Sequence, residues 1–376
     1  MVNLHSAYTT NKGGKFHKSG TIMTRIEDVY RKWQQLLPIN PQDQKRLNRK
    51  FELDFNYNSN HIEGNTLTYG QTEALLMLGE VVGSAKMKDL EDMKAHALCL
   101  QLMKQEAETD NPLTETFIRQ LHHTMLREDY TVYKQLPGGD TTSYVVHAGT
   151  YKTRPNSVVT RTGERFEYAS PQETPGLMYD LVKWYNEEAE KKEHTPIQLA
   201  ALFHYRYIRI NPFEDGNGRI ARLMVNFILY RNKLPMLVVL SKKKNAYLTA
   251  LGKVDKVVGL VPSDGAHTSF DDAQPFIKYM EDLHKTQILQ DITFISAPAE
   301  QTWWYDGEIV TFRSENTSKI LCMLKSNPRS TISDLTIAIG INKSAVQKQL
   351  NTLLDKGYIV RDGKPAIWHV FILPTV

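Results

Sequence analysis

Apolar side chains recur at three- and four-residue steps along much of the chain, which is the spacing of an amphipathic helix. Two of these segments have a proline near their start, Pro175 and Pro196, where the first turn of a helix tolerates it. The pattern therefore predicts one packed helical body, with helices over residues 24–37, 89–105, 114–126, 174–190 and 195–207.

Between Pro137 and Pro171 the pattern changes to glycines, prolines and short β-prone pieces. Such a composition is typical of short strands joined by turns. We expect a β-hairpin here, with Thr162 and Gly163 near its turn.

The C-terminal region follows a third pattern. Two helical segments after Thr317, a turn at Gly340, a third helix from Lys343 and a β-prone pair joined at Asp362-Gly363 predict a winged helix-turn-helix. Its inner face would hold Ile337, Ile341, Val346 and Leu350. The third helix would offer polar side chains to a DNA major groove, namely Lys343, Ser344, Gln347, Lys348 and Asn351. Winged helices also dock proteins or form dimers, so DNA and a homodimer both stay open as partners.

Charge is placed unevenly along the chain. The 376 residues carry a formal net charge of +4, but residues 316–376 hold eight basic and three acidic side chains and are +5. This local surplus is compatible with a nucleic-acid surface and equally with a solvated helical face.

Length and composition narrow the protein class. A chain of 376 residues suits two or three domains. No apolar run reaches the roughly 18 residues of a membrane helix, and the start lacks the apolar centre of a secretory signal. We therefore expect a cytoplasmic protein with no membrane partner. Cys99 and Cys322 are too far apart in sequence to indicate a zinc site or a disulfide framework, and we expect both to be buried.

The richest chemistry lies in Ile208 to Tyr230. Gly216, Asn217 and Gly218 precede an apolar helical stripe, and a glycine-bearing loop at a helix N-terminus can bind phosphate through free amides and the helix dipole. Arg219 and Arg222 could hold further phosphate oxygens. Asp215 beside them is a candidate Mg²⁺ ligand. The alternative is an ordinary glycine helix cap followed by surface arginines.

This segment, INPFEDGNGRIARL, resembles the signature of the Fic family, His-x-Phe-x-(Asp/Glu)-Gly-Asn-Gly-Arg-x-x-Arg. The resemblance implies a mainly α Fic-type helical core that transfers AMP from ATP to a Ser, Thr or Tyr hydroxyl of a target protein or of itself. It assigns Phe213 as the loop anchor, Asp215 as the Mg²⁺ ligand, residues 216–218 as the phosphate nest, and both arginines to the outer phosphates.

One position departs from the family pattern. Asn211 stands where the family has its histidine base, either naturally or as a single introduced replacement. A carboxamide cannot accept a proton near neutral pH, so a contribution of about 10²–10⁴-fold to the transfer rate should be lost while nucleotide binding survives. His204, two helical turns upstream, is better interpreted as a core or capping residue than as a substitute base.

Further segments extend the resemblance. Residues 59–65, SNHIEGN, resemble the family's inhibitory motif, which implies that the Glu63 carboxylate neutralises Arg222 and blocks the γ-phosphate; a helix end at Gly64 is the simpler interpretation, and both can hold. The same Glu could orient water for the reverse reaction. Residues 149–168 fit the flap that holds a target segment, with Val158 packing in it. Tyr247 is a candidate ring for stacking on adenine, or a core tyrosine.

Together these patterns predict four regions. They are an N-terminal helical region over 1–110, a Fic core over 111–296, a connector over 297–315 and a winged-helix domain over 316–376. The function expected is an autoinhibited, ATP-dependent protein adenylyltransferase of low activity. The rival is a DNA-binding regulator that senses nucleotide without transferring it.

Overall fold

The computed structural model describes residues 25–135, 141–159, 165–296, 302–363 and 367–374. The predicted Thr162-Gly163 turn lies outside these ranges. Within them, no helix combines the length and the apolar character needed to span a bilayer.

Eleven α-helices of the described residues make up the main body, which confirms the mainly helical prediction. The central pair, α7 and α8, is almost wholly buried. Among the helices that surround or extend this pair, periodicity did not predict α2, α3, α9, α10 or α11. Their bounds are α1 Ile26–Gln34, α2 Pro41–Ile62, α3 Tyr69–Glu73, α4 Met87–Ala107, α5 Glu115–Leu126, α6 Thr174–Lys191, α7 Pro196–Ile210, α8 Asn217–Arg231, α9 Lys244–Val258, α10 Pro262–Ala266 and α11 Gln274–Ser296, with short turns η1 Ala74–Leu78 and η2 Ser241–Lys243.

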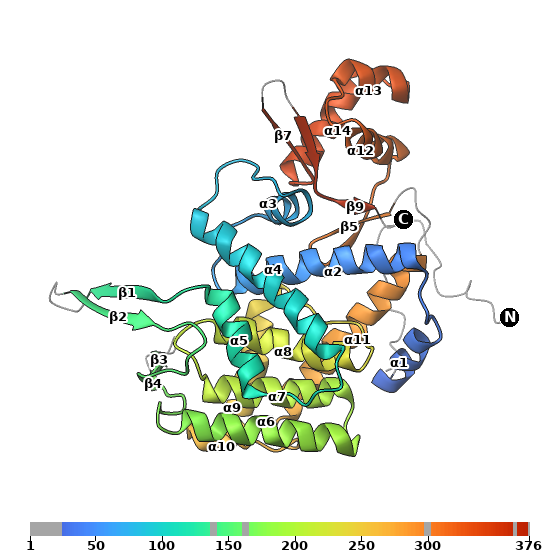
Figure 1. The fold of residues 1–376 in the computed structure, drawn as a ribbon. Helices are drawn as coiled ribbons and strands as arrows, with labels where there is room; N and C mark the ends of the chain where they lie inside the picture. Colours follow the sequence, from blue (N-terminus) through green and yellow to red (C-terminus); the bar gives the residue numbers. More distant parts are fainter. Residues whose placement is uncertain (1–24, 136–140, 160–164, 297–301, 364–366, 375–376) are drawn as a thin grey trace.

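Two antiparallel hairpins follow α5. The first, β1 Tyr130–Gln135 with β2 Thr141–Val146, projects from the helical body (Figure 1) and begins before the β-prone region that we expected from Pro137 onward. The second pairs β3 Val158–Val159 with β4 Arg165–Phe166 inside the predicted flap. The β-prone stretch therefore forms two hairpins rather than one.

The C-terminal module has the predicted order of elements: α12 Glu315–Ser326, α13 Ile332–Ile339, α14 Lys343–Asp355, β7 Ile359–Asp362 and β8 Ile367–Val370. Two expectations about burial are wrong. Ile337 is 81% exposed, because it lies two residues, and so about half a helical turn, from the buried Leu335. Cys322 is exposed on α12, whereas Cys99 is buried as expected.

The predicted connector contains ordered structure that joins the two parts. Strands β5 Thr302–Tyr305 and β6 Glu308–Thr311 form a hairpin, and the C-terminal strand β9 Leu373–Pro374 pairs with β5. Figure 1 shows α2 lying between the helical body and the winged-helix module, beside β5 and β9. Residues 59–65 at the end of α2, which resemble the inhibitory motif, are thus close to both parts of the molecule.

Candidate active site

The loop that carries the signature feeds the N-terminus of α8. Gly216 is the N-cap, with φ 74°, and no side chain of the described residues caps it. The Asn217 side chain closes the loop instead, since its Oδ1 accepts from the Phe213 amide at 2.9 Å and its Nδ2 donates to the Phe213 carbonyl at 2.7 Å. The loop is therefore stiff, while the first amides of α8 keep their capacity to bind an anion.

A buried histidine supports this loop from below. The His122 ring stacks on Phe213, with centroids 3.7 Å apart and planes 4° apart. Its Nδ1 accepts from the Gly149 amide at 2.9 Å, so Nε2 carries the proton and donates to the Asp215 carbonyl at 3.0 Å. Burial lowers the pKa of His122 to about 4. A neutral imidazole therefore links the signature loop to the start of the flap segment.

The end of α7 is held by the same flap segment. Asn211 terminates α7 in the left-handed region, with φ 50° and ψ 61°, a conformation that asparagine adopts more readily than most residues. Buried Lys152 donates from Nζ to the carbonyls of Ile210 and Asn211, each at 2.9 Å. Asn156 donates to the carbonyl of Asn211 at 3.1 Å. Three hydrogen bonds from two side chains thus fix the backbone at the position where the resemblance places the family's base.

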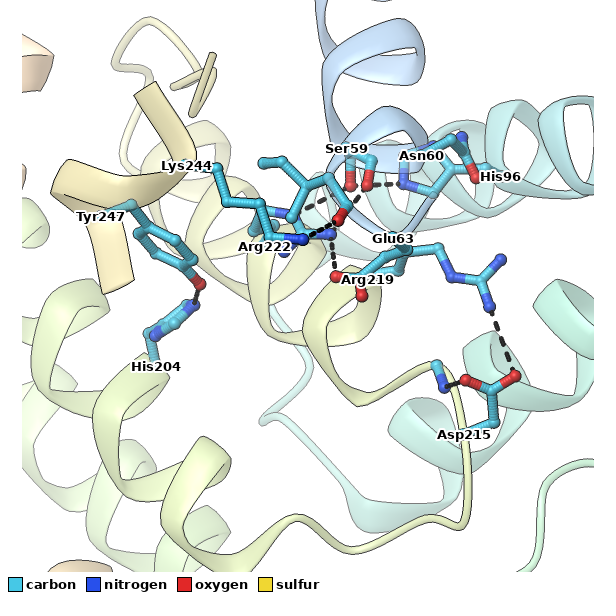
Figure 2. A network of polar contacts seen from close by, with 12 residues as sticks. Ser59, Asn60, Glu63, His96, His204, Asp215, Arg219, Arg222, Lys244 and Tyr247 are labelled. Carbon is cyan, nitrogen blue, oxygen red and sulfur yellow. Dashed lines mark hydrogen bonds and ion pairs between the residues drawn. The ribbon is translucent and has the colours of Figure 1, made fainter. Parts of the chain in front are cut away.

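A bidentate network joins α8 to the end of α2 (Figure 2). Arg222 donates from Nε to Ser59 Oγ at 3.0 Å, and from Nη2 to the Ser59 carbonyl at 2.8 Å and to Glu63 Oε1 at 2.7 Å. A Cβ added to Gly218 would collide with that same Glu63 oxygen. The carboxylate therefore occupies the space directly over the nest and neutralises the second arginine.

Arg219 and Asp215 lie on the other side of the nest. Arg219 Nη2 is 3.9 Å from Asp215 Oδ2, and the buried Arg219 Nε has no hydrogen-bond partner within the described residues. Asp215 also accepts from the Tyr130 hydroxyl at 2.6 Å. Burial raises the pKa of Asp215, but Tyr130 and Arg219 outweigh it and leave that pKa below its ordinary value. An ionised carboxylate and a guanidinium whose Nε is unpaired thus border the start of α8.

These residues fit Mg²⁺ bound together with phosphate. No cluster of three or more His, Cys, Asp or Glu suited to a metal occurs in the described part of the chain. Mg²⁺ that is shared with a nucleotide needs only one or two carboxylates, because phosphate oxygens and water complete its coordination. Asp215 is half exposed and ionised, so it suits that single-ligand role.

The Tyr247 ring is buried at the edge of the site. Its hydroxyl and His204 Nε2 are 2.7 Å apart, and burial lowers the pKa of His204 to about 3. His204 is thus a core histidine, as the sequence favoured over a substitute base. Tyr247 packs in the core here, and its stacking on adenine stays a prediction. Lys244 Nζ donates to the Ile62 carbonyl at 2.6 Å and so caps α2 (Figure 2).

The flap prediction is only partly open to inspection. Val158 lies in β3, paired with Phe166 of β4, and nothing is described of its side chain. Its packing role stays a prediction, as do the assignments of Gly216, Asn217 and Gly218 to phosphate.

Sequence reasoning missed four supporting side chains of the site: His96, His122, Tyr130 and Lys152. His96 bonds Ser59 Oγ at 3.1 Å and Asn56 Oδ1 at 2.7 Å, and burial followed by the two arginines holds its pKa well below its ordinary value. Each of the four reaches the site from a separate element, so no local motif marks them. Only the β-prone sequence around Tyr130 could have placed that residue on a strand.

Comparisons with known proteins agree with this geometry. Residues 112–229 match the Fic/DOC family, and residues 313–360 match a winged helix-turn-helix DNA-binding family. A Fic-domain-containing signalling protein from Bacteroides thetaiotaomicron is 52% identical, with TM-score 0.67 over 72% of this chain and 96% of that one. Protein adenylyltransferases from Caenorhabditis briggsae and Drosophila melanogaster are 26% and 25% identical over 63% and 60% of this chain.

The chain spans about 40% of the length of these curated adenylyltransferases. A Fic-1 structure from Caenorhabditis elegans, 23% identical with TM-score 0.54 over 71% of this chain and 69% of that one, shares the fold. The Bacteroides relative is covered almost completely at high identity. This chain therefore belongs to the Fic/DOC family and carries a winged helix-turn-helix at its C-terminal end.

Proposed function

We propose that this chain binds ATP at the start of α8 and is built as a protein adenylyltransferase that Glu63 inhibits and Asn211 impairs. Family membership and the curated adenylyltransferase relatives support the reaction class. The contact that carries the inhibition is Glu63 Oε1 on Arg222 Nη2 at 2.7 Å, against Gly218.

The inhibition follows from charge and space. A triphosphate needs both guanidinium groups, because charge-assisted, bidentate bonds to phosphate are the strongest that arginine makes. A carboxylate already on Arg222 removes one of them and repels the incoming γ-phosphate. The Glu63 side chain is 40% exposed, so it can leave toward solvent without opening the core.

The transfer step makes one bond and breaks one. The target hydroxyl oxygen attacks the α-phosphorus of ATP, the bond from that phosphorus to the α,β-bridging oxygen breaks, and pyrophosphate leaves. The hydroxyl proton passes to a base, which is the role of the histidine in the family pattern. The amides of 217–219 and Arg219 would stabilise the developing negative charge. Mg²⁺, when bound at Asp215, would neutralise phosphate charge. Asn211 can hydrogen-bond the hydroxyl but cannot take its proton. ATP binding should therefore persist while the rate of AMP transfer falls.

The test restores the base and removes the inhibitor. Asn211→His with Glu63→Gly, incubated with Mg²⁺ and ATP labelled at the α-phosphate, should label the chain itself or an added protein. ATP labelled at the γ-phosphate should give no label, because AMP rather than phosphate is transferred. Glu63→Gly alone should label at most weakly. If the double variant and both single variants transfer nothing from α-labelled ATP, the adenylyltransferase proposal fails.

A second candidate function is DNA binding through α14. The observation that favours it is the exposure of Lys343, Ser344, Gln347, Lys348 and Asn351 along one helix. Mobility shifts of genomic DNA fragments, with and without ATP, test this role. Sequence-selective shifts that Lys343→Gln weakens would support it, and shifts that change with ATP would favour a nucleotide-sensing regulator.

A further inference from the structure

The inhibitory helix α2 is held on two sides. Its Ser59 faces Arg222, as described above. Asp54 and Asn58 are four residues apart and so share another face of α2. Both are buried, and their side chains contact the segment that precedes the winged helix. Asp54 accepts from Trp304 Nε1 at 2.8 Å and from the Tyr69 hydroxyl at 2.7 Å. The C-terminal part of the chain thus holds α2, the helix that ends at Glu63, through buried hydrogen bonds.

Strand β5 joins the two hydrophobic cores at this contact with α2. Trp303 and Trp304 are neighbours in a strand, so their side chains point to opposite faces. Trp303 belongs to the winged-helix core and donates to Ser318 Oγ at 3.1 Å. Trp304 belongs to the main core, where Lys50 Nζ lies 3.8 Å from its ring centroid. A displacement of the module would therefore pull on α2 through adjacent residues.

The β5–β6 turn reaches closest to the inhibitory motif. Asp306 and Gly307 have φ 42° and 77°, as the two central residues of a tight hairpin turn require. Asn58 Nδ2 donates to Asp306 Oδ1 at 3.3 Å, and Lys242 Nζ donates to the Asp306 carbonyl at 3.0 Å. Asn58 directly precedes Ser59, so this turn lies one residue from the network that holds Arg222.

We propose that Trp304 and Asp306 are positioning residues for Glu63, and that the winged-helix module thereby keeps the inhibitory carboxylate over the nest. Neither residue touches the nest, and both act through α2. The inference rests on the proposed function, because it concerns inhibition of ATP binding. It adds that inhibition by Glu63 requires the C-terminal module to be seated on α2.

A second attachment explains why the module matters. Beyond Glu63 the chain is tied to the start of α4, where Thr66 donates from its backbone amide to Asp89 Oδ2 at 3.1 Å. Glu63 therefore lies between the hydrogen bond to α4 and the contacts that Asp54 and Asn58 make with β5 and its turn. A hydrogen bond weakens steeply when its angle is distorted, so loosening one side would weaken the contact between Glu63 and Arg222.

Calorimetric titration of the full chain with Mg²⁺–ATP and Mg²⁺–ADP tests the proposal. ADP lacks the γ-phosphate that Glu63 opposes, so the ratio of the two affinities reports inhibition alone. Glu63→Gly should raise this ratio. Trp304→Phe and Asp306→Gly should each raise it by about fivefold or more, the lower end of typical coupling between sites. Added to Glu63→Gly, neither should raise it further.

Conservative variants separate positioning from general loss of structure. Asp306→Asn keeps an acceptor for Asn58 and suits the left-handed turn, so its ratio should match the unchanged chain. Lys343→Gln, on the module but away from α2, should do the same. Thermal unfolding checks that each variant is folded, and Asp306→Gly carries the test if the buried tryptophan change prevents folding.

The outcomes distinguish the two proposals. If Glu63→Gly raises the ratio but Trp304→Phe and Asp306→Gly do not, or if they change it equally with and without Glu63, the positioning role is overturned. If the Glu63→Gly chain binds neither nucleotide, the proposed function itself fails.

Discussion

Helices α8 and α14 each begin after a short loop, but a side chain caps the first amides of α14 and none of the described side chains caps those of α8. At α14 the Asn342 side chain accepts from the Ala345 amide at 2.8 Å, so the N-terminus is capped by the chain itself. At α8 the N-cap is Gly216 in a left-handed conformation without a capping side chain among the described residues. Only α8 leaves donors for an external anion.

The cations that follow each N-terminus differ in the same sense. Arg219 and Arg222 of α8 are buried, and Arg222 is fixed by three hydrogen bonds. Lys343 and Lys348 of α14 are exposed. A site of buried, oriented charges binds one ligand shape, whereas exposed lysines contribute a salt-dependent attraction to a polyanion. Under the two proposed functions, one chain would separate specific binding of a small anion at α8 from adaptable contact with a large one at α14.

The strongest way to break this comparison is to remove one cation from each helix. Arg222→Gln leaves Ser59 and Glu63 without their partner, so the free energy of unfolding should fall by about 3 kcal/mol and ATP affinity should drop steeply. Urea denaturation and calorimetry measure both. Lys343→Gln is the matched control and should stay within about 0.5 kcal/mol of the unchanged chain. If the two substitutions changed the free energy of unfolding and the ATP affinity equally, the contrast between α8 and α14 would be wrong.

Acid should affect the α8 loop through a single buried histidine. The pKa of His122 is about 4 in the folded chain, against an ordinary 6.5, because burial disfavours the charged ring. The unfolded chain therefore binds the extra proton first as pH falls. This contribution to stability is fully present above pH 6.5, is lost between pH 6.5 and 4, and amounts to about 3 kcal/mol.

Unfolding free energies measured from pH 7 to 4 check this prediction. His122→Gln keeps a donor for the Asp215 carbonyl but does not titrate, so its stability should depend less on pH over that interval. His204, buried with a pKa of about 3, stays in both proteins and cancels in the difference. An unchanged slope in the variant would show that the loop does not sense this proton.

The nest was predictable because its signal is local. Glycines, an acid and two arginines at fixed spacing specify a turn, a helix start and one charged side, whatever the rest of the chain does. The helices around it were predictable for a similar reason, since an apolar stripe at helical spacing needs no distant partner. Their ends agree with the structure to within a few residues.

Helix α2 escaped periodicity because its buried face mixes polar with apolar side chains. Asp54, Asn56, Asn58, Ser59 and Asn60 are buried beside Leu53 and Phe55, so the apolar stripe is interrupted. Their partners, such as Trp304 and His96, lie far away in sequence. The same distance hid His122 and Tyr130, which reach Asp215 across 93 and 85 residues. Long-range polar contacts of this kind leave no repeat in the sequence.

The smallest expected effect concerns the cap of α14. Asn342→Ala removes the bond to the Ala345 amide and should lower the free energy of unfolding by about 1 kcal/mol in urea denaturation. The ratio of ATP to ADP affinity at α8 should be unchanged, because the contacts between β5 and α2 stay intact.

Gly216→Ala is the matching change at α8. An added Cβ at Gly216 would make ordinary van der Waals contact with His122 Cδ2 at 3.6 Å, but the φ of 74° strains any side chain there. We therefore expect a stability loss of about 1–2 kcal/mol accompanied by weaker binding of both nucleotides, because the strain falls on the amides that we propose bind phosphate. A change in nucleotide binding at Asn342 as large as that at Gly216 would mean that the two N-termini do not work independently.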